Sequence, residues 1–287
     1  MLSRSTLLHL RIPFSLFLLP VFLFAISQIS QGTWERSLLV FIVLHLLLYP
    51  ASNGYNSYFD RDEESIGGLR KPPPVTKDLY WVSLILDLIA ILLGLIISWQ
   101  FALMVFIYGL VSKAYSHPKI RLKRYPWIGW IVAGFFQGFF TFMMTVSGVQ
   151  GITDTEASYL LPAAFLTSLV LWGSYPMTQI YQHQEDFKRG DITLSQRLGT
   201  LGTFHFTAAI FLVASTGFIL YFRTYFNISH GIIFLGCMVP VAVYFGYWYL
   251  KVRKDNSNAD FDHTMGLNFI SSTSLNICFL ILYFLNH

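Results

Sequence analysis

Four carboxylates and an amide follow directly after a long apolar run in the first quarter of the sequence. They belong to Asn56, Asp60, Asp62, Glu63 and Glu64. Asn56, Asp60 and Glu64 are four positions apart, so on a continuing α-helix they share one face, with neighbouring Cβ atoms about 5–6 Å apart. Asn56 and Glu64 then lie about 12 Å apart along the axis, which is too far for one ion. Two ions, or an ion with a multiply charged ligand, fit this spacing.

Like charges at this density repel one another unless a cation or a basic partner neutralises them. Ligands that offer only oxygen select a hard cation such as Mg²⁺, which prefers one or two carboxylates together with substrate phosphates. Arg70 and Lys71 stand directly before three prolines and are expected to contact phosphate oxygens. The alternative is a solvated loop that only ends a helix.

A second cluster of the same design begins 126 positions after the first. It contains, in order, Gln182, Glu185, Asp186, Lys188 and Arg189. The first three residues stand at i, i+3 and i+4, which places them on one helical face. Taken alone, the cluster is also compatible with a capped helix end that carries flanking basic residues. Two such clusters on one membrane face favour a shared ligand.

The elements that must position these clusters are transmembrane helices. Of the 287 residues, 54% are hydrophobic and only 12% are charged, whereas soluble domains carry about 25% charged residues. We expect an all-α, polytopic membrane helix bundle that forms a single domain over residues 1–287. A cleaved signal peptide is disfavoured because the first apolar run is long. Nine segments approach the length of about 20 residues that spans a bilayer: 12–30, 38–58, 79–98, 101–116, 127–149, 158–182, 202–222, 230–250 and 265–286.

The distribution of Lys and Arg predicts the orientation of these helices. With the N-terminus inside, 17 of the 19 Lys and Arg residues fall on inside segments, and only Arg36 and Arg223 fall outside. We therefore expect a cytoplasmic N-terminus, an outside C-terminus and chemistry at the cytoplasmic face, in the plasma (inner) membrane if the source is bacterial. The same asymmetry explains the net charge of +4 without nucleic acid as a partner.

Both clusters resemble known motifs of the UbiA-type membrane prenyltransferases. The first resembles their Asn-x-x-x-Asp-x-x-x-Asp signature, with an Asp60-Arg61-Asp62 core, and the second resembles their second Asp-rich motif, with Thr193-Leu194 following. Between them, Tyr115-Ser116 and the basic residues from Lys119 to Arg124 are similar to the family's loop after the fourth helix. With nine predicted helices, the likeness covers nearly the whole chain.

The resemblance implies a helical bundle around a central cavity in which Mg²⁺ and the diphosphate of an isoprenoid donor bind. It implies transfer of the isoprenyl group to an electron-rich acceptor that is small and hydrophobic, aromatic or lipid-like. The metal ligands, direct or through water, are expected to be Asn56, Asp60, Glu64, Gln182, Glu185 and Asp186. The diphosphate is expected to contact Arg70, Lys71, Lys119, Lys123 and Lys188. The catalytic candidates are Asp62 and Asp191, as proton acceptors or as partners of the metal ligands, and Tyr115, beside the diphosphate.

Two departures from the family pattern bear on activity. Glu64 stands where the family usually has Asp, and this change keeps the negative charge. Gln182 stands where the second motif usually begins with Asp, and this change removes a negative charge. A family member with weakened activity or an altered substrate is therefore an alternative.

Two other classes of membrane protein were weighed. A CDP-alcohol phosphotransferase requires an Asp-x-x-Asp-Gly-x-x-Ala-Arg run, which the sequence lacks. A transporter or carrier with an acidic cation site predicts acids at mid-membrane, and here only Asp87 lies deep in an apolar segment. Asp87 is expected either to orient the acceptor or to be a protonated or internally paired structural residue. The sequence does not choose the acceptor or the length of the isoprenyl chain.

Overall fold

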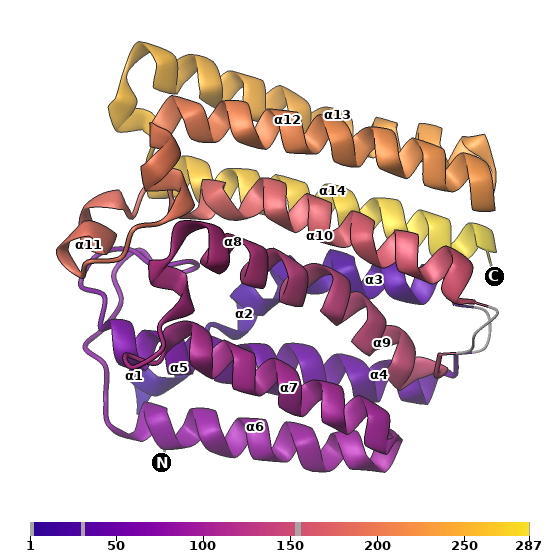
Figure 1. Cartoon of the computed structure of the whole chain (residues 1–287), viewed down its shortest axis with the longest axis horizontal. Coiled ribbons are helices and arrows are strands. Elements are labelled where there is room, and N and C mark those ends of the chain that lie inside the picture. The colour runs from indigo at the N-terminus through magenta and orange to yellow at the C-terminus, as the bar shows by residue number, and fades with distance from the viewer. Residues whose placement is uncertain (1–2, 30–31, 153–155, 287) are drawn as a thin grey trace.

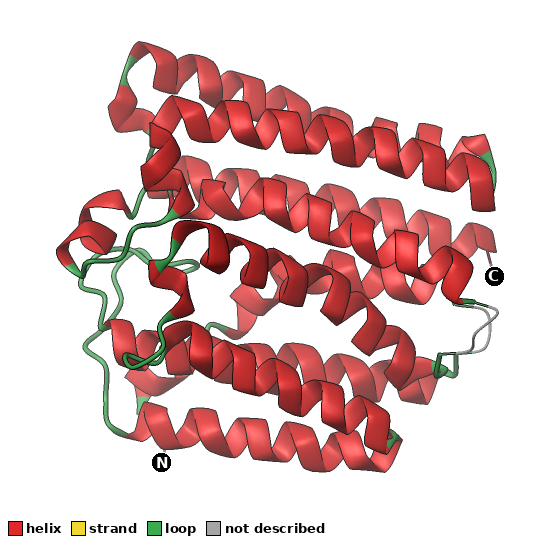
Figure 2. Cartoon of the chain, in the orientation of Figure 1, coloured by secondary structure: helices red, strands yellow, loops and turns green. Residues whose placement is uncertain are grey.

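The computed structural model describes residues 3–29, 32–152 and 156–286. Within these residues, every element of regular secondary structure longer than an isolated bridge is a helix. Figure 2 shows helices joined by loops, with no strand in the part of the chain that is described. A single isolated β-bridge joins Ile66 and Leu69 in the loop after the first acidic cluster. The predicted all-α class is therefore confirmed.

Eight helical stretches of the described chain are long and apolar enough to cross a membrane. Three are composite. Arg4–Ser27 contains α1 (Arg4–His9), α2 (Ile12–Ser15), η1 (Leu16–Leu18) and α3 (Leu19–Ser27). Trp34–Asp60 contains α4 (Trp34–Phe41), the π-helical η2 (Ile42–Leu48) and α5 (Tyr49–Asp60). Pro126–Val149 contains α8 (Pro126–Phe135), the π-helical η4 (Phe136–Phe140) and α9 (Thr141–Val149). The others are α6 (Asp78–Ile97), α10 (Ala157–Gln179), α12 (Leu194–Tyr225), α13 (Ile228–Lys254) and α14 (Phe261–Asn286).

The difference between the nine predicted spans and these eight lies at α7 (Trp99–Ser116). This helix carries Lys113, whose ammonium forms an ion pair with Asp87 of α6 inside the bundle. Asp87 is thus an internally paired residue rather than an unpaired acid. In Figure 1 the N-terminus lies at the end that carries α11 (His183–Lys188), and the C-terminus lies at the opposite end. α7 runs between the same two ends of the bundle in Figure 1, although it is not among the eight stretches that are long and apolar enough to cross a membrane.

The π-helical turn η4 is fixed against α10 by a close approach of the two backbones. A Cβ atom on Gly138 would lie 2.5 Å from Cα of Ser168, so only glycine permits this crossing. The hydroxyl of Ser168 accepts the N–H of Phe139 at 2.9 Å and donates to the carbonyl of Gly134 at 3.0 Å. These bonds satisfy backbone groups that the wider helical turn leaves free. Gln137 on the same turn consequently lines the interior of the bundle.

The first span is broken between α1 and α2 at Arg11, whose backbone is left-handed with φ 48° and ψ 44°. The segment after the break is held to the second span by two reciprocal bonds. Ser15 donates its hydroxyl to the carbonyl of His45 at 2.8 Å, and the ring Nδ1 of His45 donates to the carbonyl of Ser15 at 3.1 Å. The break turns the side chain of Arg11 toward the interior.

Candidate functional site

Both acidic clusters line one cavity of about 240 Å³ at the end of the bundle that carries α11. We call it the polar chamber. Its acidic residues are Asp60, Asp62, Asp186 and Asp191, its amide residues are Asn53, Asn56, Gln137, Gln179 and Gln182, and its basic residues are Arg11, Lys123 and Arg189. Four carboxylates from segments more than 100 residues apart in the sequence thus face a common space.

A second cavity of about 480 Å³, the apolar chamber, continues the polar chamber toward the middle of the bundle. Its wall is mainly aliphatic and aromatic and includes Val21, Leu171, Phe218, Leu275 and Phe279. Seven residues line both chambers and form their boundary: Phe14, Ser52, Asn53, Tyr108, Gln137, Tyr175 and Thr178. A ligand with a charged head and a hydrocarbon tail therefore fits across this boundary.

The first acidic cluster is only partly helical. The helix α5 ends at Asp60 because Arg61 adopts a left-handed backbone with φ 51°. Asn56 and Asp60 share the inner face of α5, as expected. Glu64 lies beyond the helix, with a side chain that is 51% exposed and an oxygen 3.6 Å from Nζ of Lys188. The expectation that all three residues share one helical face is therefore wrong for Glu64, because the helix stops four residues before it.

Lys123 and Arg121, from the loop after α7, neutralise the first cluster. The ammonium of Lys123 donates to Oδ1 of Asn56 at 3.1 Å and forms an ion pair with Asp60. Arg121 approaches the other oxygen of Asp60 at 3.3 Å. Ser116 holds the amide of Asn56 in place with a hydrogen bond of 2.7 Å to Oδ1.

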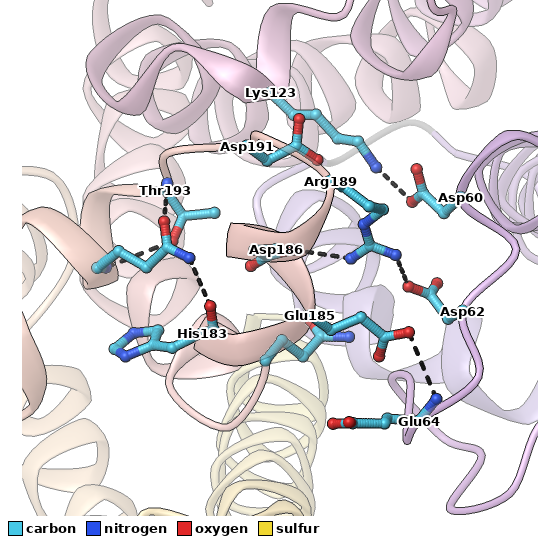
Figure 3. A network of polar contacts seen from close by, with 12 residues as sticks. Asp60, Asp62, Glu64, Lys123, His183, Glu185, Asp186, Arg189, Asp191 and Thr193 are labelled. Carbon is cyan, nitrogen blue, oxygen red and sulfur yellow. Dashed lines mark hydrogen bonds and ion pairs between the residues drawn. The ribbon is translucent and has the colours of Figure 1, made fainter.

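The guanidinium of Arg189 bridges the two clusters, as Figure 3 shows. One terminal nitrogen forms an ion pair with Asp62, and the other lies 2.9 Å from Oδ1 of Asp186. Burial raises the pKa of the Asp186 carboxyl to about 6, and the positive charge of Arg189 offsets only part of this rise. The two clusters therefore form one electrostatic unit.

Two residues of the second cluster contact the loop that follows the first. Oε1 of Glu185 accepts the backbone N–H of Glu63 at 2.9 Å and that of Glu64 at 3.4 Å, a contact visible in Figure 3. The amide of Gln182 donates to the carbonyl of Ser65 at 3.2 Å. The other oxygen of Glu185, Oε2, is buried and has no hydrogen-bond partner. Glu185 thus fixes the loop with one oxygen, although its side chain lines neither chamber.

The catalytic candidates lie within or beside these contacts. Both oxygens of Asp191 are bound by Arg121, and Asp62 is bound by Arg189. Tyr115 lines the polar chamber and shares a hydrogen bond with the hydroxyl of Tyr175, which stands at the boundary between the chambers. All three side chains are therefore brought together at the site.

Most of the basic residues expected to contact a diphosphate lie elsewhere. Arg70 forms an ion pair with Asp262 at the start of α14, and its side chain is 63% exposed. Lys71, Lys119 and Lys188 are exposed and do not line either chamber. Only Lys123 of that set lines the polar chamber.

Arg11, Arg121 and Arg189, by contrast, reach the site although they were not among the residues expected to contact the diphosphate. Arg189 stands within the second motif, and this position could have identified it as a residue of the site. Arg11 and Arg121 turn inward at left-handed residues, with φ of 48° and 47°, and the residue pattern does not reveal such turns.

The acidic, amide and hydroxyl side chains of the polar chamber fit a hard cation, since they offer oxygen ligands. Among the residues that the structure describes, no group of three or more His, Cys, Asp or Glu side chains is arranged as a metal cage. The reason is that the carboxylates of the chamber are drawn to Lys123, Arg121 and Arg189. Glu185 has an unpartnered Oε2 beside this network, but its side chain does not line the chamber.

Comparisons with known proteins agree with the fold. The model of the UbiA prenyltransferase family matches residues 16–272. A structure of a UbiA homolog from Archaeoglobus fulgidus bound to GPP and Mg²⁺ is 14% identical, with a TM-score of 0.71 over 97% of this chain and 99% of that one. The apo structure of a UbiA homolog from Aeropyrum pernix K1 is 16% identical, with a TM-score of 0.72 over 94% and 98%. A structure concerning digeranylgeranylglyceryl phosphate synthase in membranes is 19% identical, with a TM-score of 0.63 over 98% of both chains. No curated protein sequence matches the chain.

Proposed function

The chain belongs to the UbiA prenyltransferase family, and we propose that it transfers an isoprenyl group from a prenyl diphosphate to an electron-rich, aromatic or lipid-like acceptor in a Mg²⁺-dependent reaction. The observation that carries this proposal is the shared chamber of Asp60 and Asp186, which continues into an apolar chamber. One space offers charges for a diphosphate, and the other offers hydrocarbon walls for an isoprenyl chain.

The donor's diphosphate would lie in the polar chamber. We assign the divalent ions to Asn56, Asp60, Glu185 and Asp186, with Gln182 and Glu64 in supporting positions. When bound there, Mg²⁺ neutralises the charge that develops on the departing diphosphate oxygens.

Lys123 and Arg189 would contact the same diphosphate oxygens. Both side chains already bind carboxylates of the chamber. They would exchange a carboxylate oxygen for a diphosphate oxygen. Tyr115 would add a hydroxyl contact from the chamber wall.

In the reaction, the bond between C1 of the isoprenyl group and the diphosphate oxygen breaks, and its electron pair leaves with the diphosphate. The boundary residues then surround the electron-deficient C1, and the rings of Tyr108, Tyr175 and Phe14 can stabilise its positive charge. The apolar chamber excludes water, which would otherwise capture the carbocation. A nucleophilic atom of the acceptor forms the new bond to C1.

The acceptor must also lose a proton. We assign its capture to Asp62, because that carboxylate lines the polar chamber and is held in position by Arg189. Asp191 has both oxygens engaged by Arg121 and is assigned a positioning role.

We place the polar chamber at the cytoplasmic face of the membrane, with the N-terminus on the same side. The support is the distribution of Lys and Arg together with the position of α11 and the N-terminus at one end of the bundle in Figure 1.

The test uses the whole chain in detergent and the donor analogue geranyl thiolodiphosphate, whose C–S bond resists cleavage. With Mg²⁺, the analogue should raise the thermal stability of the wild type, because a ligand that binds only the folded state stabilises it. Asp60→Asn and Asp186→Asn should lose this effect. Glu35→Gln, an exposed carboxylate in α4, is the matched control and should keep it. If both Asp variants were stabilised as much as the wild type, the proposal would be wrong. If the protein were a membrane carrier, the analogue would not stabilise the wild type.

A further inference from the structure

Among the amides that line the polar chamber, Gln137 is the one whose side chain forms no hydrogen bond with any described residue. The other four are held by the protein. Asn53 donates to the carbonyl of Leu10, and Gln182 donates to that of Ser65. Oδ1 of Asn56 accepts the hydroxyl of Ser116, and Oε1 of Gln179 accepts the N–H of Ser195. Gln137 therefore has a different role from these fixed amides.

The free amide of Gln137 is an uncharged group with both kinds of hydrogen-bonding capacity. It offers one oxygen that accepts and two N–H groups that donate. A polar group that is removed from water without partners is unfavourable, and polar side chains inside membrane bundles mark the paths of ligands. A ligand that bonded to this amide would supply the missing partners without breaking a contact within the protein.

The backbone that presents Gln137 is fixed independently of any ligand. The residue stands on the π-helical turn η4, and such turns are frequent at functional sites. The next residue, Gly138, packs so closely on α10 that a Cβ atom there would lie 2.5 Å from Cα of Ser168. The hydroxyl of Ser168 accepts the N–H of Phe139 at 2.9 Å. The position of the amide is thus set in advance by the contact between η4 and α10.

The place of Gln137 in the site indicates which part of a substrate it meets. The residue lines both chambers and so belongs to their boundary. A donor with its diphosphate in the polar chamber and its tail in the apolar chamber places C1 at this boundary. The ring of Phe136, next to Gln137 in the chain, lies 6.3 Å from that of Tyr108, one of the rings assigned to C1. The acceptor's nucleophilic atom must approach at this level.

We propose that Gln137 forms a hydrogen bond with an uncharged hydroxyl group of the acceptor and thereby directs the acceptor's nucleophilic atom toward C1. A hydroxyl both donates and accepts, as the amide does, and a neutral amide adds no attraction for an anion. The proposal rests on the proposed function, since it requires a prenyl diphosphate in the same site. It makes Gln137 a residue that selects a phenol or a lipid alcohol over an acceptor without a free hydroxyl.

The experiment measures probe binding to the full chain in detergent that is saturated with Mg²⁺ and geranyl thiolodiphosphate. One pair of probes is 4-hexylphenol and its methyl ether, 4-hexylanisole. The other pair is 1-O-octylglycerol and its dimethyl ether. In at least one pair, the wild type should bind the hydroxyl compound about fivefold or more tightly than the ether, since one hydrogen bond is gained. The pair that shows the preference distinguishes a phenol from a lipid alcohol.

Gln137→Met keeps the length of the side chain and removes its polar atoms, so it should abolish this preference and leave binding of the ether unchanged. Since variants are compared in the same detergent, partition of a probe into micelles cancels. A role in helix packing alone would not change the ratio of hydroxyl to ether affinity. The donor analogue is the folding control, because Gln137→Met should bind it as the wild type does. Gln100→Met, at an exposed glutamine of α7, is the matched control and should keep the preference.

Asn268 of α14 provides the competing assignment. Its amide also forms no hydrogen bond with the described residues, but it lines only the apolar chamber. Asn268→Leu should therefore keep the preference for the hydroxyl, and loss of the preference in this variant alone would overturn the assignment to Gln137.

Three further outcomes are decisive. If the wild type does not distinguish hydroxyl from ether in either pair, or if Gln137→Met retains the preference, the proposal is wrong. If Gln137→Met loses the donor analogue, Gln137 acts on the donor or on the fold, and the acceptor assignment also fails. If the wild type itself does not bind the donor analogue, the proposed function fails, which is a separate result.

Discussion

Arg121 grips the carboxylate of Asp191 through two parallel hydrogen bonds, with Nε 2.7 Å from Oδ1 and Nη2 2.7 Å from Oδ2. Asp191 is only 2% exposed, and the hydrogen bond to its carboxylate raises the pKa of the Arg121 guanidinium. The same guanidinium also approaches Asp60 at 3.3 Å. Arg121 therefore links the loop after α11, which carries Asp191, to Asp60 of the first acidic cluster.

We predict that Arg121→Lys and Asp191→Asn each lower kcat/KM for prenyl transfer by about tenfold or more, because each breaks a charge-assisted two-bond contact. Since both remove the same contact, the double variant should be scarcely worse than either single one. The measurement is a double-mutant cycle on product formation in membranes. If the losses of kcat/KM in the two single variants multiplied in the double variant, Asp191 would act independently of Arg121, as a base.

Glu185 should act both as a loop anchor and as a metal ligand, and two substitutions separate these roles. Glu185→Gln keeps an oxygen for the N–H groups of Glu63 and Glu64 but loses the charge, whereas Glu185→Ala loses both. We expect Glu185→Gln to raise the Mg²⁺ concentration for half-maximal donor binding by about tenfold or more, with protease sensitivity of the loop unchanged. Glu185→Ala should raise both. An unchanged Mg²⁺ requirement in Glu185→Gln would limit the residue to anchoring.

The raised pKa of Asp186 predicts a pH dependence of divalent-ion binding. Burial raises this pKa from 3.8 to about 6, so below pH 6 a proton occupies the carboxyl and competes with the ion. The apparent affinity for Mg²⁺, measured with geranyl thiolodiphosphate, should fall about tenfold per pH unit below pH 6 and be level above about pH 7. At concentrations of Mg²⁺ and analogue that are high enough to detect its weakened binding, Asp186→Asn should lose this slope. A slope that persists in the variant would assign the titration to another group.

The same shift has a consequence for stability without Mg²⁺. A carboxyl whose pKa is higher in the folded than in the unfolded protein stabilises the fold fully below pH 3.8, and this contribution is lost as the pH rises through about 6. The sign is thus opposite to that of an ordinary surface carboxylate in an ion pair.

Among the basic residues near the site, Lys123 should matter far more than Lys119. Lys123 lines the polar chamber and contacts Asn56 and Asp60, whereas Lys119 is exposed at the surface. Lys123→Met should raise the dissociation constant of geranyl thiolodiphosphate by about tenfold or more, and Lys119→Met by less than about threefold, since an exposed charge is screened by solvent. Equal losses in the two variants would contradict the chamber as the diphosphate site.

This contrast shows where the sequence was informative and where it was not. Helical spacing placed Asn56 and Asp60 on one face, because that periodicity is a property of the backbone. It could not show that α5 ends at Asp60, since the terminating turn is made by Arg61, a residue with no special tendency to be left-handed. The all-α membrane fold followed from composition alone. Which of the many Lys and Arg residues turn inward depends on tertiary contacts such as those of Arg121 with Asp191.

The last prediction concerns the ion pair between Asp87 of α6 and Lys113 of α7, which lies inside the bundle with both side chains largely buried. Removal of one partner leaves an uncompensated buried charge, which costs about 3–5 kcal/mol, whereas an apolar replacement of both is nearly neutral. Asp87→Asn should therefore lower the thermal stability in detergent strongly, and Asp87→Leu combined with Lys113→Met should restore most of it. Prenyl transfer by the double variant should approach the wild-type rate, because neither residue lines a chamber. A stable double variant that has lost its activity would instead give the pair a role in acceptor binding.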